Sequence, residues 1–176
     1  MVEAFQNFLD KAEIETQNRM EVRLIELLKE KRLTLALAES LTGGMISARI
    51  TSVAGSSEYF IGSVVCYHPR IKVQYCGVEA KTLAQFGAVS EAVAKEMAIG
   101  IKKRFGTSIG LGITGAAGPT PHGGAPVGKV WLAVAKEEGE VKTKEYTFDG
   151  GRESIRKKAT EAALGLLWFE FGQLEI

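Results

Sequence analysis

Apolar residues along the chain recur at two different spacings, which predicts that strands and helices alternate. Five short apolar runs have the length and composition typical of β-strands. They cover residues 33–38, 60–67, 108–113, 128–135 and 141–148. Other segments carry apolar residues three and four positions apart, which predicts helices over 43–53, 69–76, 90–105 and 152–171.

This alternation predicts an α/β fold, a three-layer α/β/α sandwich in which a sheet lies between two layers of helices. The last two predicted strands are separated only by a short glycine-containing turn at 137–140, which is typical of a hairpin. We therefore expect a mixed, mostly parallel sheet. At 176 residues, with no linker or repeat, the chain is long enough for one domain with a real core.

Two apolar stripes at helical spacing precede the first predicted strand. The first comprises Phe5, Phe8, Leu9 and Ala12, and the second comprises Met20, Leu24, Leu27 and Leu28. They predict two amphipathic helices or one bent helix. We expect the second stripe to cover a face of the sheet. The first has no obvious partner within a compact domain, which makes it a candidate dimerisation arm of a homo-oligomer.

Charge and cysteine content narrow the range of partners. Lysine and arginine number 22 against 21 for aspartate and glutamate, so the composition gives no sign of a nucleic-acid partner. Five charged residues between positions 3 and 15 argue against a signal peptide or a membrane span there. Cys66 and Cys76 lack the Cys-x-x-Cys spacing, and we expect both to be reduced, buried thiols. The composition thus predicts a cytoplasmic protein.

Ser40 stands where the first predicted strand gives way to a helix that opens at the paired glycines Gly43 and Gly44. Open α/β sheets bind ligands at the carboxyl ends of their strands. N–H groups in the first turn of a helix can stabilise an anion, including the oxyanion of an attacked carbonyl. Ser40 is therefore a candidate nucleophile. The alternative is that it only caps the helix.

A serine nucleophile needs a base, and the histidines and aspartates do not offer one. The chain has only His68, His122, Asp10 and Asp149, which argues against a Ser-His-Asp triad. The two histidines and two distant cysteines also lack the spacing of zinc ligands.

Lys72 is the best remaining candidate for the base. Pro69 suits the first position of a helix, so Lys72, one turn later, should point back toward the strand end that carries Tyr67. That geometry would bring Tyr67 and Lys72 to one cleft, where burial or positive charge would lower the pKa of the lysine. The alternative is an ordinary solvated lysine and a tyrosine that merely ends a strand.

Two glycine-rich segments follow later strands. The segment at 114–119 supplies small residues whose N–H groups a ligand can approach closely. The segment at 123–129 has the glycine and lysine spacing of a Walker A loop, but Val130 and the strand that follows argue against that motif. We expect a lid-like loop there instead. Arg152 and Arg156 lie on one face at the start of the last helix, where surface charge is the default interpretation.

Taken in order, these motifs resemble the CinA C-terminal domain family. The resemblance rests on residues 38–44, 54–57, Tyr67 with Lys72, 87–90, 114–119 and 126–131. It extends from about Arg19 to about Phe171, so it divides the chain into an N-terminal helical extension at 1–18 and a family domain at 19–176.

The resemblance implies a function and a set of site residues. Enzymatic members of the family are nicotinamide-nucleotide amidohydrolases, which would make a small nucleotide the substrate and require no metal or organic cofactor. The implied catalytic residues are Ser40, Tyr67 and Lys72. The implied substrate-binding residues are Thr42, Gly43, Gly44, Gly55, Ser56, Thr114, Gly115, Ala117, Gly118 and Arg152, the last as a phosphate ligand.

One departure from the family leaves other functions open. His68 and Pro69 follow Tyr67 where the family usually has serine and asparagine. If that asparagine orients the substrate amide, its loss affects the identity of the substrate more than the type of reaction. An amidase acting on another small amide therefore stays open, as does a non-catalytic nucleotide-binding module associated with competence.

Overall fold

The structure, a computed structural model, describes residues 20–136 and 139–172. The predicted stripe at residues 5–12 and the turn residues 137–138 lie outside this part. The five strands are β1 (Leu35–Glu39), β2 (Phe60–Val65), β3 (Ile109–Gly115), β4 (Lys129–Ala135) and β5 (Val141–Thr147). The helices are α2 (Met20–Glu30), α3 (Met45–Thr51), η1 (Ser56–Glu58), α4 (Pro69–Cys76), α5 (Ala80–Phe86), α6 (Glu91–Phe105) and α7 (Arg152–Gly172).

The strands form one mixed sheet in the order β2-β1-β3-β4-β5. β1 pairs in parallel with both β2 and β3, whereas β4 is antiparallel to both of its neighbours. The α/β class, the mixed sheet and the final hairpin are thereby confirmed. Only β4 runs against the other four strands, so parallel and antiparallel pairings occur in equal number.

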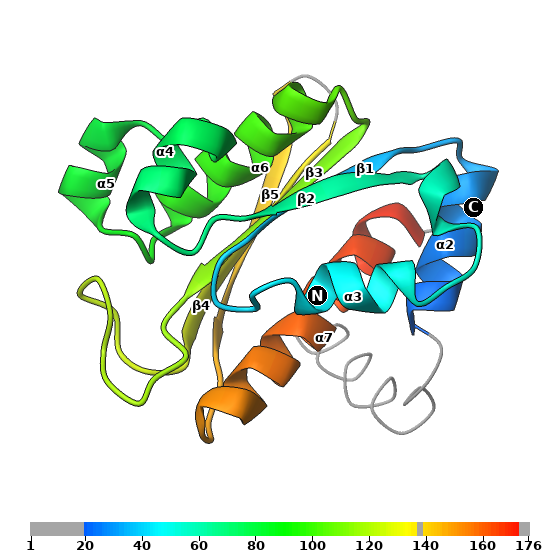
Figure 1. Ribbon diagram of the computed structural model, residues 1–176. Coiled ribbons are helices and arrows are strands. Elements are labelled where there is room, and N and C mark those ends of the chain that lie inside the picture. Colours follow the sequence, from blue (N-terminus) through cyan, green and yellow to red (C-terminus); the bar gives the residue numbers. More distant parts are fainter. Residues whose placement is uncertain (1–19, 137–138, 173–176) are drawn as a thin grey trace.

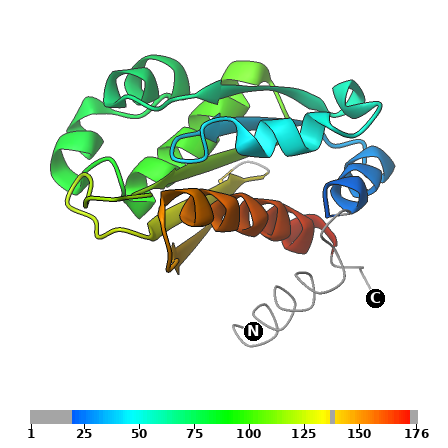
Figure 2. The ribbon, with the colours of Figure 1, turned by 60° about the horizontal axis from the view of Figure 1, so that its bottom comes forward.

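Helices cover both faces of the sheet (Figure 1). α4, α5 and α6 lie on one side, and α2, α3 and α7 lie on the other (Figure 2). β1 shows why the sheet holds both layers, since Leu35 and Leu37 join the core on the α2/α3/α7 side while Ala36 and Ala38 face the α4/α6 side. The alternation of large and small side chains sets how closely each layer approaches.

The small face of the sheet allows α6 to pack very close to it. A Cβ atom at Gly110 would lie 2.1 Å from the carbonyl oxygen of Ala98, and one at Gly112 would lie 2.5 Å from that of Ala94. Both distances are far below van der Waals contact, so these strand positions require glycine. The close approach fixes α6, and α4 packs against it in turn.

The carboxyl ends of β1, β2, β3 and β5 all lie at one edge of the sheet, because these four strands share a direction. The segments that follow them, including Ser40, Tyr67, Ala116 and Arg152, therefore gather at this edge. This is the usual ligand-binding edge of an open α/β sheet. No helix within the described residues is long and apolar enough to cross a membrane.

Candidate active site

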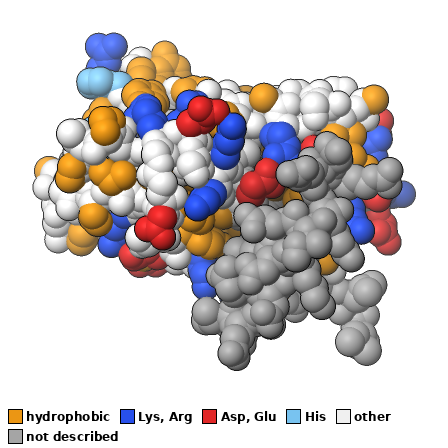
Figure 3. All heavy atoms as spheres, turned by 90° about the horizontal axis from the view of Figure 1, so that it is seen from below, with side chains coloured by type: hydrophobic (Ala, Val, Ile, Leu, Met, Phe, Trp, Pro, Cys, Tyr) orange, Lys and Arg blue, Asp and Glu red, His pale blue; other side chains and the backbone are white. Residues whose placement is uncertain are grey.

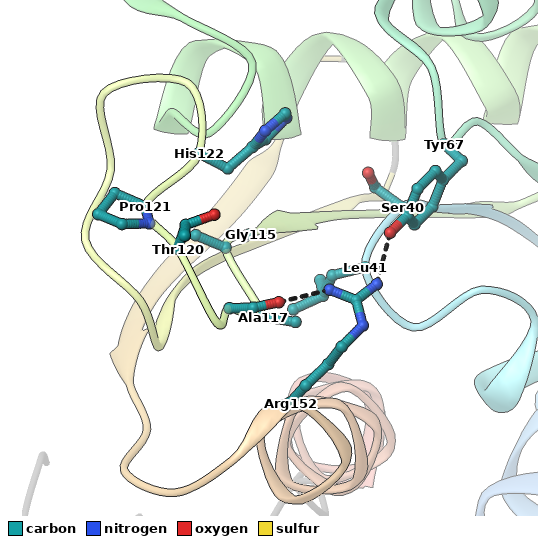
Figure 4. A pocket seen from close by; sticks show the side chains of 11 residues that line it. Ser40, Leu41, Tyr67, Gly115, Ala117, Thr120, Pro121, His122 and Arg152 are labelled. Carbon is teal, nitrogen blue, oxygen red and sulfur yellow. Dashed lines mark hydrogen bonds between the residues drawn. The ribbon is translucent and has the colours of Figure 1, made fainter.

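Ser40 lies directly after β1 at the floor of a pocket. Its N–H group donates a hydrogen bond of 3.1 Å to the carbonyl oxygen of Ile113, and its side chain is largely buried. The pocket encloses about 170 Å³. It is lined by Ser40, Leu41, Tyr67, Gly115, Ala116, Ala117, Gly118, Thr120, Pro121, His122 and Arg152 (Figure 4).

Lys72 reaches Ser40 from the first turns of α4. Pro69 is the first residue of that helix, and the Nδ1 atom of His68 caps it by accepting from the N–H of Arg70. This start places the Nζ atom of Lys72 2.6 Å from Ser40 Oγ and 2.6 Å from the carbonyl oxygen of Cys66. The prediction that the helix brings Lys72 to Ser40 is confirmed, whereas His68 is an exposed capping residue.

The environment of Lys72 favours the neutral amine. The residue is only 1% exposed, and within the described part of the chain it forms no salt bridge with a carboxylate. Burial lowers the pKa of Lys72, with a smaller opposing effect from the thiols of Cys66 and Cys76. Both cysteines are free and buried, as predicted. A neutral amine in contact with a serine hydroxyl can accept its proton.

Tyr67 lies beside Ser40 but is held by Arg152 rather than by Lys72. Its hydroxyl accepts a 2.6 Å hydrogen bond from Nη2 of Arg152, whose Nη1 donates to the carbonyl oxygen of Gly118 at 2.7 Å. Figure 4 shows Arg152 extending from the start of α7 between Tyr67 and the loop after β3. Tyr67 is 56% exposed and makes no hydrogen bond with Lys72 in the structure described. The two residues still come to one cleft, as expected, because Tyr67 lines the pocket and Lys72 contacts Ser40 at its floor.

The turn after Ser40 is organised by Glu39, a residue that the sequence did not single out. The Gly44 N–H donates to the Glu39 carboxylate, and the Gly43 N–H donates to the carbonyl oxygen of Ser40. These two N–H groups are therefore not free to bind an oxyanion, contrary to expectation. The N–H groups of Leu41 and Thr42 have no acceptor within the described residues. Ser40 itself does not cap α3, because its Oγ contacts Lys72 instead.

The predicted ligand-binding segments separate into two groups. Gly115, Ala117 and Gly118 line the pocket. Thr114 does not, because it is buried and its hydroxyl donates to the carbonyl oxygen of Ala88. Gly55 and Ser56 precede β2, so they lie at the opposite edge of the sheet from Ser40 and are not brought to the site.

Four further lining residues were not predicted: Leu41, Thr120, Pro121 and His122. The last three belong to the loop between β3 and β4, which forms the wall of the pocket opposite Arg152 (Figure 4). Their position directly after the glycine-rich segment at 114–119 was the available signal. The rejection of a Walker A motif is confirmed, since strand β4 begins at Lys129 and no helix follows.

Potential metal ligands do not cluster in the described part of the chain, and charges of both signs occur on the face that Figure 3 shows. Across residues 20–136 and 139–172, no three His, Cys, Asp or Glu side chains come together as a metal site would require. Figure 3 views the molecule from below, and on the part of that face not covered in grey, basic and acidic side chains are interspersed. A ligand in the pocket would meet Ser40, with Lys72 buried behind the serine, and Arg152 at the mouth of the pocket.

Comparisons with known proteins agree with this architecture. Residues 17–170 match the family model described as the CinA C-terminal domain. A CinA-like protein of Gemmatimonas aurantiaca is 49% identical over 138 residues, which are 77% of this chain and 32% of that protein. The chain spans about a third of the length of the curated relatives it matches.

Solved structures agree with the fold along most of the chain. A competence/damage inducible protein of Agrobacterium tumefaciens superposes with a TM-score of 0.82 at 35% identity, covering 88% of this chain and 94% of that one. A competence damage-inducible protein A of Klebsiella pneumoniae gives a TM-score of 0.84 at 32% identity, with coverages of 89% and 97%.

Proposed function

The chain belongs to the CinA C-terminal domain family, and on that premise we propose that it hydrolyses the carboxamide of nicotinamide mononucleotide to give nicotinic acid mononucleotide and ammonia. The observation that carries the proposal is the 2.6 Å contact between Ser40 Oγ and the buried Nζ of Lys72. Serine activated by a desolvated lysine is a nucleophile suited to acyl transfer. The pyridine nucleotide is taken from the resemblance to the enzymatic members of the family.

The reaction proceeds in two halves. Ser40 Oγ attacks the amide carbon while its proton passes to the neutral Nζ of Lys72. The tetrahedral intermediate then collapses as the lysine returns that proton to the amide nitrogen, which leaves as ammonia. Water attacks the resulting ester, with Lys72 again accepting a proton, and the carboxylate product is released as Ser40 regains its hydrogen.

The oxyanion of the intermediate requires N–H donors close to Ser40. We assign this role to the N–H groups of Leu41 and Thr42, which have no acceptor within the described residues. Leu41 also lines the pocket. Donors fixed by the backbone before the reaction starts are worth about 10²–10³-fold each in turnover.

Arg152 is the proposed ligand for the phosphate of the nucleotide. It lies at the pocket mouth, and its guanidinium already binds two neutral oxygens, those of Tyr67 and Gly118. A phosphate is a stronger acceptor for guanidinium than a phenol or a peptide carbonyl. Binding of the phosphate would exchange these contacts and free Tyr67 to pack against the substrate. In this proposal Tyr67 positions the substrate, and Lys72 is held by Ser40 and the carbonyl oxygen of Cys66.

Ammonia release from nicotinamide mononucleotide and from other small amides tests the proposal and its alternatives. Release from nicotinamide mononucleotide, with stoichiometric nicotinic acid mononucleotide, supports it. Release only from other small amides would favour an amidase of different specificity, the alternative kept open by His68 and Pro69. Tight binding of the mononucleotide in calorimetry without any ammonia would instead indicate a nucleotide-binding module.

A further inference from the structure

Glu39 accepts five hydrogen bonds, whereas a side chain that caps a helix usually accepts one. Its carboxylate is fully buried, and one oxygen accepts from the Thr42 hydroxyl at 2.8 Å and from the N–H groups of Gly44 and Ile46 at 2.9 and 3.2 Å. The other accepts from the N–H and hydroxyl of Ser47 at 2.9 and 2.5 Å. All five partners are donors, so this site suits the ionised carboxylate, which only accepts.

Hydrogen bonds, rather than a salt bridge, hold this carboxylate within the described residues. Among the salt bridges of the described chain none involves Glu39, so hydrogen bonds alone stabilise the carboxylate. Burying a charge is costly unless it is fully hydrogen-bonded. A serine or aspartate cap would satisfy the start of α3 at lower cost. The excess of donors around Glu39 therefore calls for a role beyond helix capping.

Arg156 holds the same turn from its other side. From α7, its Nε donates to the carbonyl oxygen of Leu41 at 2.9 Å and its Nη2 donates to that of Thr42 at 3.0 Å. Glu39 thus binds donors of the turn, whereas Arg156 binds its acceptors. Gly43 fits between the two, since a Cβ at that position would lie 3.1 Å from Nη2 of Arg156 and the backbone there has a φ of +60°.

These contacts fix the direction of the peptide groups next to Ser40. In a planar trans peptide, the N–H points opposite to the preceding C=O. Because the Leu41 carbonyl points at Arg156, the Thr42 N–H points away from α7. Because the Ser40 carbonyl accepts from the Gly43 N–H, the Leu41 N–H points away from Gly43.

We propose that Glu39 and Arg156 are positioning residues that clamp the 40–44 turn from both sides. The clamp keeps Ser40 Oγ within hydrogen-bond reach of Lys72 and keeps the Leu41 and Thr42 N–H groups oriented without acceptors. It rests on the proposed role of Ser40 as the nucleophile. Misplacement of a reacting group by about 1 Å is enough to lower turnover by about 100-fold, so loosening either side should be measurable.

The test compares Arg156→Met and Glu39→Gln with the control Arg49→Met. Arg49 is also a partly buried arginine with two side-chain partners, but these are Glu21 of α2 and Glu161 of α7 rather than residues of the turn. Two rates are measured for each folded variant: ammonia release from nicotinamide mononucleotide, and labelling of Ser40 by a fluorophosphonate. In that labelling the Ser40 oxygen bonds to phosphorus, fluoride leaves, and the proton passes to Lys72.

For Arg156→Met we expect both rates to fall by about 100-fold, with KM within about threefold of wild type and the pH at half-maximal turnover unchanged. Arg156→Lys, which keeps one donor, should recover part of the rate. The control should keep both rates even where its melting temperature falls. Glu39→Gln should behave like Arg156→Met if it folds, and Arg156→Met alone decides the matter if it does not.

Two outcomes would contradict the proposed clamp. The first leaves the assignment of Ser40 as the nucleophile intact, and the second does not. If wild type is labelled at Ser40 and folded Arg156→Met is labelled at the same rate, the clamp is wrong while the nucleophile assignment stands. If wild type is not labelled at all and releases no ammonia, Ser40 is not an activated nucleophile, and the clamp fails with the proposed function.

Discussion

Replacing Lys72 by methionine separates chemistry from folding at this site. Methionine has nearly the length of lysine and suits a buried position, but it can neither accept nor donate the proton of Ser40. Lys72 is 1% exposed and its Nζ lies 2.6 Å from Ser40 Oγ, so solvent has little access to the position of the amine. General-base catalysis contributes about 10²–10⁴-fold, and we expect Lys72→Met to lose turnover toward the upper end of that range.

The pH dependence gives the sharper test of the same residue. Because burial lowers the pKa of Lys72, the neutral amine forms at a lower pH than the value of about 10.4 for a free lysine. Wild-type turnover should therefore rise with pH through an apparent pKa below 10.4. Lys72→Met should lack this rise. Lys72→Arg, which keeps the charge and cannot lose its proton, should be as inactive as the methionine variant.

The lowered pKa of Lys72 should also make the free energy of unfolding depend on pH. Between the lowered pKa of folded Lys72 and about 10.4, the unfolded chain binds more protons than the folded one, so folding becomes more favourable as pH rises. The free energy of unfolding of wild type relative to Lys72→Met should thus increase across that window, with a slope of at most about 1.4 kcal/mol per pH unit.

The assay is ammonia release between pH 6 and 10, paired with urea unfolding of both proteins at each pH. A Lys72→Met protein that keeps the wild-type rise of turnover with pH would refute the assignment of Lys72 as the base. A stability difference that stays flat with pH would show that Lys72 is not desolvated when folded.

Three further predictions concern the rest of the site and the chain. Arg152→Ala should reduce kcat/KM for nicotinamide mononucleotide by a much larger factor than for nicotinamide riboside, which lacks the phosphate. Equal losses on both substrates would mean that Arg152 only holds Tyr67 and Gly118 in place. Tyr67→Phe should raise KM more than it lowers kcat, because its hydroxyl contacts Arg152 and not Lys72; a loss confined to kcat would restore a role in proton transfer. Deletion of residues 1–16 should lower the mass in light scattering while leaving a soluble domain, because their apolar stripe would otherwise face water; an unchanged mass would mean that these residues pack within their own chain.

The elements of the fold could be predicted because their signals are local. All five strands and the helices predicted from residue 43 onward agree with the structure to within two residues at either end. Two short elements were not predicted: α5, with only seven residues, and the single turn η1. Neither segment repeats an apolar spacing often enough to distinguish a helix from a loop.

The candidate site could be predicted only where one element fixes the side chain. Pro69 sets the start of α4 and thereby the direction of Lys72, so that direction could be predicted from the sequence, whereas its catalytic role was implied by the resemblance. Gly55 and Ser56 were expected at the site from the order of motifs, but they precede a strand rather than follow one, which places them at the opposite edge of the sheet.

The role of Glu39 could not be read from the sequence at all. A glutamate at the end of an apolar run looks like a solvated charge, and its five donors come together only when the turn is folded. Arg156 was noted in the sequence only as surface charge by default, because its acceptors lie about 115 residues away along the chain.

Ammonia release by wild type and by Ser40→Ala, measured side by side on nicotinamide mononucleotide, tests the central claim most directly. The substitution removes one hydroxyl at a turn whose backbone is held by Ile113 and Arg156, so the variant should melt like wild type. The account predicts ammonia with stoichiometric nicotinic acid mononucleotide from wild type, and a rate lower by about 10³-fold or more from the variant. A well-folded Ser40→Ala protein that releases ammonia at the wild-type rate would contradict it.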